Sequence, residues 1–183
     1  MSDQPANAET LAATLARYRG MRGAPLTATM PADRDAIRRF VQAIMDRDPC
    51  YFDEDVAKAS KFGSIVAPPL YPVHAFRQPA GTPDPLDALR DDPDADGTAG
   101  SDAVGFGLPP IESPFRRLLN GGNEITFFRC LHAGERAVAR ARYADVTLRQ
   151  GRSGDLLLVV IETEFTTTAG DRLLINRQTL IWR

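Results

Sequence analysis

The sequence is poor in the residues that build metal sites and disulfide frameworks. It has only two cysteines and two histidines among 183 residues, and Cys50 and Cys130 stand far apart, outside any Cys-x-x-Cys or Cys/His pattern. We therefore expect neither a zinc site nor a disulfide framework, and the sequence predicts no cofactor. The net charge is only −2. Because nucleic-acid binding proteins usually have a strongly basic balance or face, this class is disfavoured.

Long hydrophobic runs are also missing. The longest aliphatic run, residues 156–161, is far shorter than the roughly 20 residues that a membrane-spanning helix needs. The first residues contain no basic segment followed by an apolar stretch, so no secretory leader is expected. These observations predict a soluble, cytoplasmic protein without a membrane partner.

The composition is otherwise that of a folded protein. Hydrophobic residues make up 43% of the chain and charged residues 25%, which are ordinary values for globular domains. We expect an N-terminal arm over residues 1–30 and one domain over residues 31–183. Residues 78–114 are rich in proline and aspartate. This segment is predicted to be a surface excursion, either mobile or laid over a partner.

The pattern of apolar residues predicts helices before the excursion and strands after it. Helices are expected over residues 8–19 and 53–62, and another helix is expected to begin after a cap at Asp33. A first strand is expected over residues 23–30. Strands are expected over residues 124–128, 136–148, 156–168 and 173–182. The alternation changes phase near Ala144 and Asp145, which predicts a β-bulge. The prediction is an α+β fold, in which a curved antiparallel sheet, including a meander of four strands, wraps around the helix of residues 53–62.

Several segments in one order resemble MaoC-like dehydratases, especially the N-terminal dehydratase half found beside a MaoC domain. The segments are residues 37–53, 58–69, 119–129, 133–136, 151–154 and 177–180. This resemblance implies a single hot-dog fold. It also implies reversible addition of water to the double bond of a trans-2-enoyl thioester, carried on CoA or acyl carrier protein.

Active members of this family have an Asp and, five residues later, a His that follows an Asn-Pro pair. In this sequence Asp46 matches the Asp, Asp48 replaces the Asn, Pro49 matches, and Tyr51 stands where the His is expected. A phenol has a reference pKa near 10 and is a poor base at neutral pH, whereas imidazole titrates in that range. The resemblance therefore implies a degenerate subunit whose MaoC-like hot-dog partner supplies the catalytic His.

Two further functions remain open. The chain could be a self-sufficient homodimer, either a hydratase that uses Asp46 with Tyr51 or His74, or a thioesterase that uses a carboxylate. It could also be a non-catalytic protein that binds acyl thioesters. Asp46 and Asp48 are either remnants of a catalytic pair or turn-forming residues, and Tyr51 either donates a hydrogen bond to the substrate or packs beside the helix.

The candidates for substrate binding are Gly121, Gly122 and Asn123. Paired glycines before a strand allow a ligand to approach closely and to meet backbone amides, or they form an ordinary bulge. A strand face carries alternating basic residues, which either contact CoA phosphates or form a solvated surface; they are Arg136, Arg140 and Arg142.

Overall fold

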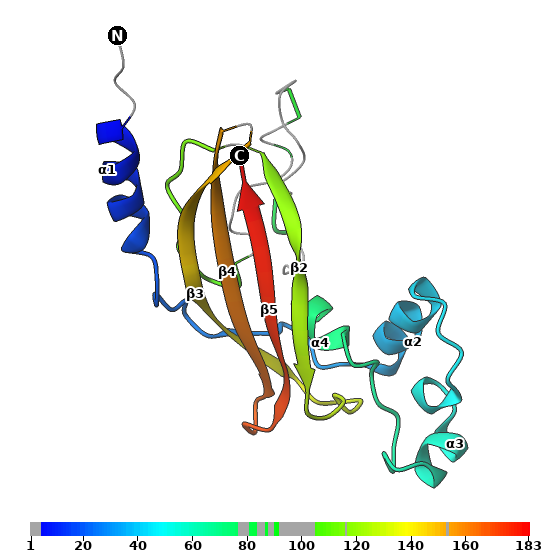
Figure 1. Cartoon of the computed structure of the whole chain (residues 1–183). Helices are drawn as coiled ribbons and strands as arrows, with labels where there is room; N and C mark the ends of the chain where they lie inside the picture. Colours follow the sequence, from blue (N-terminus) through cyan, green and yellow to red (C-terminus); the bar gives the residue numbers. More distant parts are fainter. Residues whose placement is uncertain are drawn as a thin grey trace.

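A curved antiparallel sheet forms the body of the structure (Figure 1). The structure is a computed structural model that describes residues 5–76, 81–83, 87, 90–91, 105–115, 117–152 and 154–183. The strands are β1 (Leu26–Thr27), β2 (Leu118–Phe127), β3 (Ala137–Gly151), β4 (Gly154–Thr167) and β5 (Arg172–Trp182). They lie in the order β1-β3-β4-β5-β2. The expected α+β class with a curved antiparallel sheet is confirmed.

The position of β2 differs from the predicted meander of four strands. Only β3, β4 and β5 form a meander, and β2 pairs with the far side of β5, with Glu124 opposite Arg177. The physical reason lies in the connection from β2 to β3. Leu131 in this connection is fully buried in the core, and His132 forms an isolated bridge with Val66. The chain therefore passes through the core instead of turning back as a hairpin.

Two β-bulges lie at the same level of the sheet. One falls between Tyr143 and Asp145 on β3, where the sequence predicted it, and the other falls between Asn120 and Gly122 on β2. The β3 bulge keeps the apolar side chains on the core side, since Tyr143 before it and Val146 after it are both buried. The change of phase in the sequence is thus confirmed as one extra residue in the strand.

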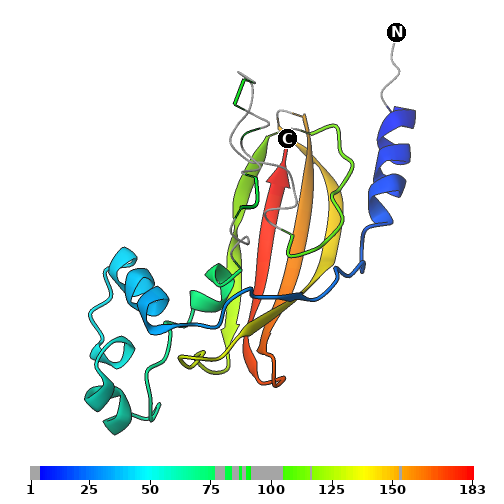
Figure 2. The same ribbon diagram turned by 180° about the vertical axis from the view of Figure 1, so that it is seen from behind.

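Short helices gather at one end of the sheet. They are α2 (Arg34–Ala43), the 3₁₀ helix η1 (Pro49–Tyr51), α3 (Glu54–Ala59) and α4 (Tyr71–His74), while α1 (Pro5–Ala16) lies near β3. Helix α2 begins as predicted, because the Asp33 side chain accepts a hydrogen bond from the Ala36 N–H at 2.8 Å. In both ribbon views α2 and α3 lie to one side of the sheet, level with its lower half, and α4 lies between them and β2 (Figures 1 and 2).

The helix predicted over residues 53–62 does not cover the sheet. Helix α3 is shorter, contacts η1, and buries only Ala57, because most of its other side chains are charged. The following segment enters the core instead. Tyr71 is buried in the same cluster as Phe165 of β4, and the ring of Phe76 lies 5.9 Å from that of Phe165. The aromatic residues after α3 therefore supply the apolar surface that α3 lacks.

The described part of the predicted excursion packs on the sheet. The ring of Phe106 lies 5.2 Å from that of Phe165, and the Tyr143 hydroxyl donates to the Pro109 carbonyl at 2.7 Å. Residues 77–80, 84–86, 88–89 and 92–104 lie outside the described residues. The N-terminal segment also packs here, since Leu15 and Tyr18 are buried in the cluster that contains Tyr143. No helix in the described ranges is long and apolar enough to cross a membrane.

Candidate functional site

The end of α2 places the backbone of Asp46. The Asp46 N–H donates to the Val41 carbonyl at 3.1 Å, and the Met45 N–H donates to the Gln42 carbonyl at 3.2 Å. These two bonds form a Schellman motif, which needs a left-handed residue just past the helix. Met45 fills this position with φ 57°. The chain therefore reverses at Met45, and Asp46 leaves the helix at a fixed angle.

The carboxylates of Asp46 and Asp48 are both bound to backbone amides. Asp46 Oδ1 accepts from the Asp48 N–H at 3.0 Å, and Asp48 Oδ1 accepts from the Cys50 N–H at 2.9 Å. Asp48 thereby caps η1, which begins with Pro49. Both side chains thus form the turn, as one of the two interpretations of the sequence expected. A catalytic role for either carboxylate stays a prediction.

Tyr51 stands inside this turn with its ring almost fully buried. Only 9% of the residue is exposed, and it belongs to the main core cluster. Burial, followed by the nearby acidic groups of Asp46, Cys130, Asp48 and Cys50, raises the pKa of Tyr51 to about 12. The phenol is therefore neutral at physiological pH, so it can donate a hydrogen bond but cannot act as a base.

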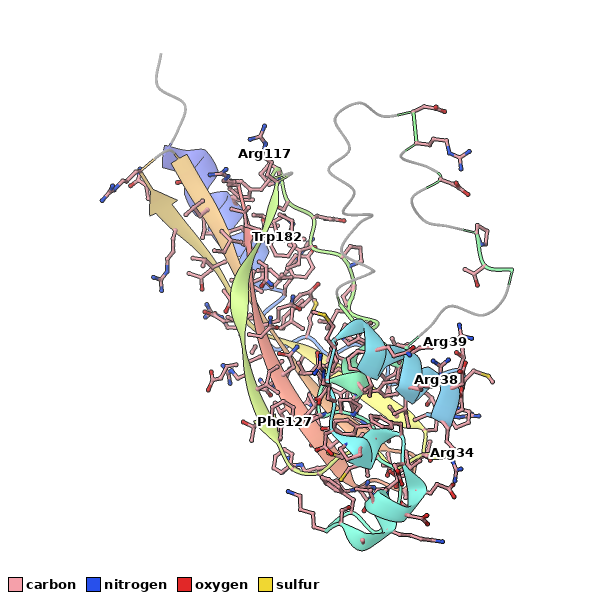
Figure 3. All side chains as sticks on the ribbon, turned by 90° about the vertical axis from the view of Figure 1, so that its right-hand side faces the viewer. Arg34, Arg38, Arg39, Arg117, Phe127 and Trp182 are labelled. Atoms are coloured by element: carbon pink, nitrogen blue, oxygen red, sulfur yellow. The ribbon has the colours of Figure 1, made fainter. Side chains whose placement is uncertain are left out.

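A shallow hollow of about 300 Å³ opens beside Tyr51. Its apolar lining includes Phe52 and Ile65, and its charged lining includes Arg34 and Arg38 of α2. Figure 3 shows the labelled arginines of α2 on the same end of the molecule as Phe127 of β2. These arginines have carboxylate partners, since Arg38 binds Asp35 at 2.7 Å and Arg34 binds Glu54. The hollow thus combines a neutral phenol with paired charges.

The two histidine side chains have contacts other than the Asp46 carboxylate. His74 is on α4, where its ring lies 5.3 Å from the ring of Phe40. His132 follows β2, and its Nδ1 lies 2.8 Å from the Ser64 hydroxyl. Within the described part of the chain, no ion pair joins either histidine to Asp46. A substitute base from His74 is therefore without support in the geometry.

Gly121, Gly122 and Asn123 lie on the edge strand β2, in its half near Leu118. Gly121 is the extra residue of the bulge, and a methyl group there would come within 2.9 Å of Thr179 Cγ2. The Gly122 N–H already donates to Asn120 Oδ1 at 2.9 Å. The structure does not bring these residues to the turn of Asp46 and Tyr51, because α2 and α4 lie at the Phe127 end (Figures 1 and 3). Their role in substrate binding stays a prediction.

The arginines of β3 are paired across the sheet. Arg142 binds Glu162 at 2.7 Å, Arg177 of β5 binds the same carboxylate at 2.9 Å, and Arg140 donates to the Thr166 hydroxyl at 3.0 Å. Glu162 therefore balances charge on Arg142, whereas the partner of Arg140 is a neutral hydroxyl. This arrangement favours the interpretation as a solvated sheet face over a phosphate site.

One polar feature of the core was missed in the sequence. The core side of β5 carries Leu174, Asn176, Gln178 and Leu180 in alternation, and Asn176 is only 7% exposed. The available signal was the presence of two polar residues, Asn176 and Gln178, at alternate strand positions that are otherwise apolar. They place amide groups between two hydrophobic clusters of the core.

Comparison with known proteins assigns the family. Residues 17–175 match the family model "FAS1-like, dehydratase domain region". A UPF0336 protein of Parafrankia sp. (strain EAN1pec) is 30% identical over 138 residues, 75% of this chain and 74% of that protein. A UPF0336 protein of Saccharopolyspora erythraea is 26% identical over 159 residues, 87% of this chain and 85% of that protein.

Solved structures share the fold. The ChsH1–ChsH2 complex from Mycobacterium tuberculosis matches with a TM-score of 0.65 and 21% identity, over 96% of this chain and 90% of the other. The HadBC (3R-hydroxyacyl-ACP dehydratase) complex from the same organism gives 0.58 and 18%, over 90% and 96%. A MaoC-like dehydratase from Rhodospirillum rubrum gives 0.58 and 17%, over 90% and 91%. The sheet is thus a hot-dog fold like that of the MaoC-like dehydratase of known structure, and the chain belongs to the FAS1-like dehydratase domain region family.

Proposed function

We propose that this chain is a subunit of an enoyl-thioester hydratase or (R)-3-hydroxyacyl-thioester dehydratase whose catalytic His comes from a hot-dog partner. The observation that carries the proposal is Tyr51, a buried neutral phenol at the position where active members of the family have an imidazole. Its role would be to shape the acyl tunnel and to stabilise the partner.

The chemistry of hydration explains why Tyr51 matters. Water must lose a proton as it attacks, and the substrate must gain one, so active members use a carboxylate and an imidazole together. The pKa of Tyr51 is raised to about 12, so the phenol keeps its proton at neutral pH. Asp46 alone lacks a partner that can exchange a proton with the same water.

The exposed edge of β2 supports a second subunit. β2 ends the sheet, and an unpaired edge strand is a natural site for association. Leu119, Phe127 and Phe128, on and just after this strand, are exposed although they are large and apolar. Two of the similar structures are named as complexes, ChsH1–ChsH2 and HadBC. A hot-dog partner at β2 would cover this apolar edge.

One of these similar structures supports the substrate class that we propose. The HadBC complex is named a 3R-hydroxyacyl-ACP dehydratase. An acyl thioester on CoA or acyl carrier protein is the corresponding substrate for this chain. The apolar core side of the sheet suits an acyl chain.

An assay of the lone chain and of the co-expressed pair tests the proposal. The chain is purified alone and together with a MaoC-like protein encoded by a neighbouring gene, and loss of the enoyl group of crotonyl-CoA is followed. We expect turnover only from the pair. The matched variant is Asp46→Asn, because the amide oxygen can still accept from the Asp48 N–H and preserve the turn.

Other outcomes point to the rival functions. If the lone chain hydrates crotonyl-CoA and Asp46→Asn strongly lowers that rate, the chain is a self-sufficient homodimer. Release of free CoA without hydration would identify a thioesterase. Binding without turnover, both alone and in the pair, would identify a non-catalytic thioester-binding protein.

A further inference from the structure

Polar side chains cross the core side of the sheet between two apolar clusters. Asn176 of β5 faces Thr163 of β4, which is only 2% exposed. Gln178 follows on the same side of β5, and it is paired with Asn123 of β2. One neighbouring cluster contains Phe165 and the other contains Ile161. We call Thr163, Asn176, Gln178 and Asn123 the polar row.

Asn176 lies next to Thr163 in the buried part of the polar row. Its Oδ1 atom is buried and has no hydrogen-bond partner among the described residues. A buried acceptor without a partner is destabilising, and an apolar residue of similar size would avoid that penalty. A hydrogen-bond donor that does not belong to the described residues would therefore stabilise Asn176.

Exposure increases along the row toward the edge of the sheet. Asn176 is buried, Gln178 is half-buried, and Asn123 on β2 is exposed. The polar row thus connects the middle of the apolar core side to the edge strand that we assign to the partner subunit. A ligand entering at that edge would meet polar groups along its path and an unmet acceptor at the end.

We propose that the polar row is a subsite for a hydroxyl group on the acyl part of the thioester, with Asn176 as the residue that binds it. This inference rests on the proposed function and specifies the substrate class. The Oδ1 atom of Asn176 lacks a hydrogen-bond donor, and the flanking hydrophobic clusters offer contacts to an apolar carbon skeleton. An acyl chain that bears a hydroxyl away from the reacting double bond meets both requirements.

Binding of paired thioesters to the assembled complex and to the lone chain tests this subsite. The probes are medium-chain acyl-CoA thioesters, each with and without one hydroxyl on the chain, measured by titration calorimetry. The wild type should bind the best hydroxylated probe about tenfold more tightly than its plain counterpart. Asn176→Leu should lose this preference and should unfold at the same or a higher urea concentration. The control is Thr179→Val, on the opposite side of β5, which should keep the preference.

Four results would overturn the inference, and they differ in whether they also remove the proposed function. Equal binding of both probe types by the wild type, or an unchanged preference in Asn176→Leu, removes the subsite and leaves the proposed function intact. A clear loss of stability in Asn176→Leu means that Asn176 has a structural partner, such as a buried water, and also removes the subsite. Failure of every thioester to bind removes the proposed function together with the subsite.

Discussion

The backbone N–H of Asp46 donates a hydrogen bond to the carbonyl oxygen of Val41 at 3.1 Å, so the last turn of α2 determines where Asp46 lies. This bond exists only because Met45 takes a left-handed conformation. The turn that follows is held by carboxylate-to-amide hydrogen bonds. Asp46 and Asp48 thus have a structural role, because their carboxylates hold this turn.

Replacing Met45 by glycine should stabilise the protein. Met45 has φ 57° and is 83% exposed, so it bears the penalty of a left-handed residue and gains little from burial. We expect Met45→Gly to raise the free energy of unfolding by about 0.5–1 kcal/mol. Urea unfolding measures this value. The control Met30→Gly, at another exposed methionine without positive φ, should lower it instead.

Removing the cap of η1 should destabilise the turn. The Asp48 carboxylate accepts from the Cys50 N–H at 2.9 Å, and alanine cannot replace this bond. We expect Asp48→Ala to lower the free energy of unfolding by about 1 kcal/mol. Asp48→Asn keeps an acceptor oxygen and should remain close to the wild type. Equal losses in both variants would show that the charge, and not the cap, matters.

Stability should fall at alkaline pH because of Tyr51. The ordinary pKa of this phenol is 10.0, and burial and nearby acidic groups raise it to about 12 in the folded protein. The folded state therefore keeps the proton longer than the unfolded chain does. The resulting stability is complete below about pH 10 and is lost as the pH rises toward 12. Urea unfolding across this range should show a steeper decline for the wild type than for Tyr51→Phe; parallel curves would contradict the assignment.

Glu135 should make the fold sensitive to acid. Burial alone would raise its pKa, but hydrogen bonds from Arg129 at 2.8 Å and from the His132 N–H at 2.7 Å outweigh burial and lower the pKa below 4.5. The stabilising effect is therefore present above about pH 4.5 and is lost as the pH falls through the folded-state pKa.

The test for Glu135 is its neutral analogue. Glu135→Gln should lower the free energy of unfolding at pH 7 by about 1–2 kcal/mol and should flatten its decline in acid. Denaturant unfolding at several pH values measures both effects. A variant that declines in acid as steeply as the wild type would place the acid-sensitive group elsewhere.

A charge on the exposed edge should weaken association with the partner. Leu119 lies on β2 with its large apolar side chain exposed. We expect Leu119→Asp to lower the affinity for the partner at least tenfold while leaving the unfolding of the lone chain nearly unchanged. Co-purification and titration measure the affinity. Thr168→Asp in the β4–β5 turn is the control, and equal weakening by both would place the interface away from β2.

Local patterns predicted the features that depend on neighbouring residues. The phase change at Ala144 and Asp145 predicted the β3 bulge, and Asp33 predicted the start of α2, because both signals act within a few residues. The pairing of β2 with β5 was missed, since it depends on the buried path of Leu131 and not on the strand's own sequence. Long-range pairing leaves no local pattern.

The features of the candidate site also differ in whether they depend on neighbouring residues or on distant ones. The turn-forming roles of Asp46 and Asp48 follow from their spacing, and the sequence included them as one alternative. Packing of Tyr51 was also one of the two alternatives, but its raised pKa is not visible from the motif, because its environment includes Cys130, which is remote in the sequence. The unmet acceptor of Asn176 likewise depends on packing across the sheet.

The two bulges also determine the shape of the sheet. Gly121 and Ala144 each add one residue at the level where Thr179 and Val160 pair without interruption. The strands that flank the β4–β5 pair, β2 and β3, therefore each carry one extra residue at this height, and such an insertion bends its strand and increases the local right-handed twist. Deleting either residue would remove that bend and turn the side chains beyond it to the opposite face of the sheet, so two single-residue insertions keep the same side chains facing the core on both sides of each bulge.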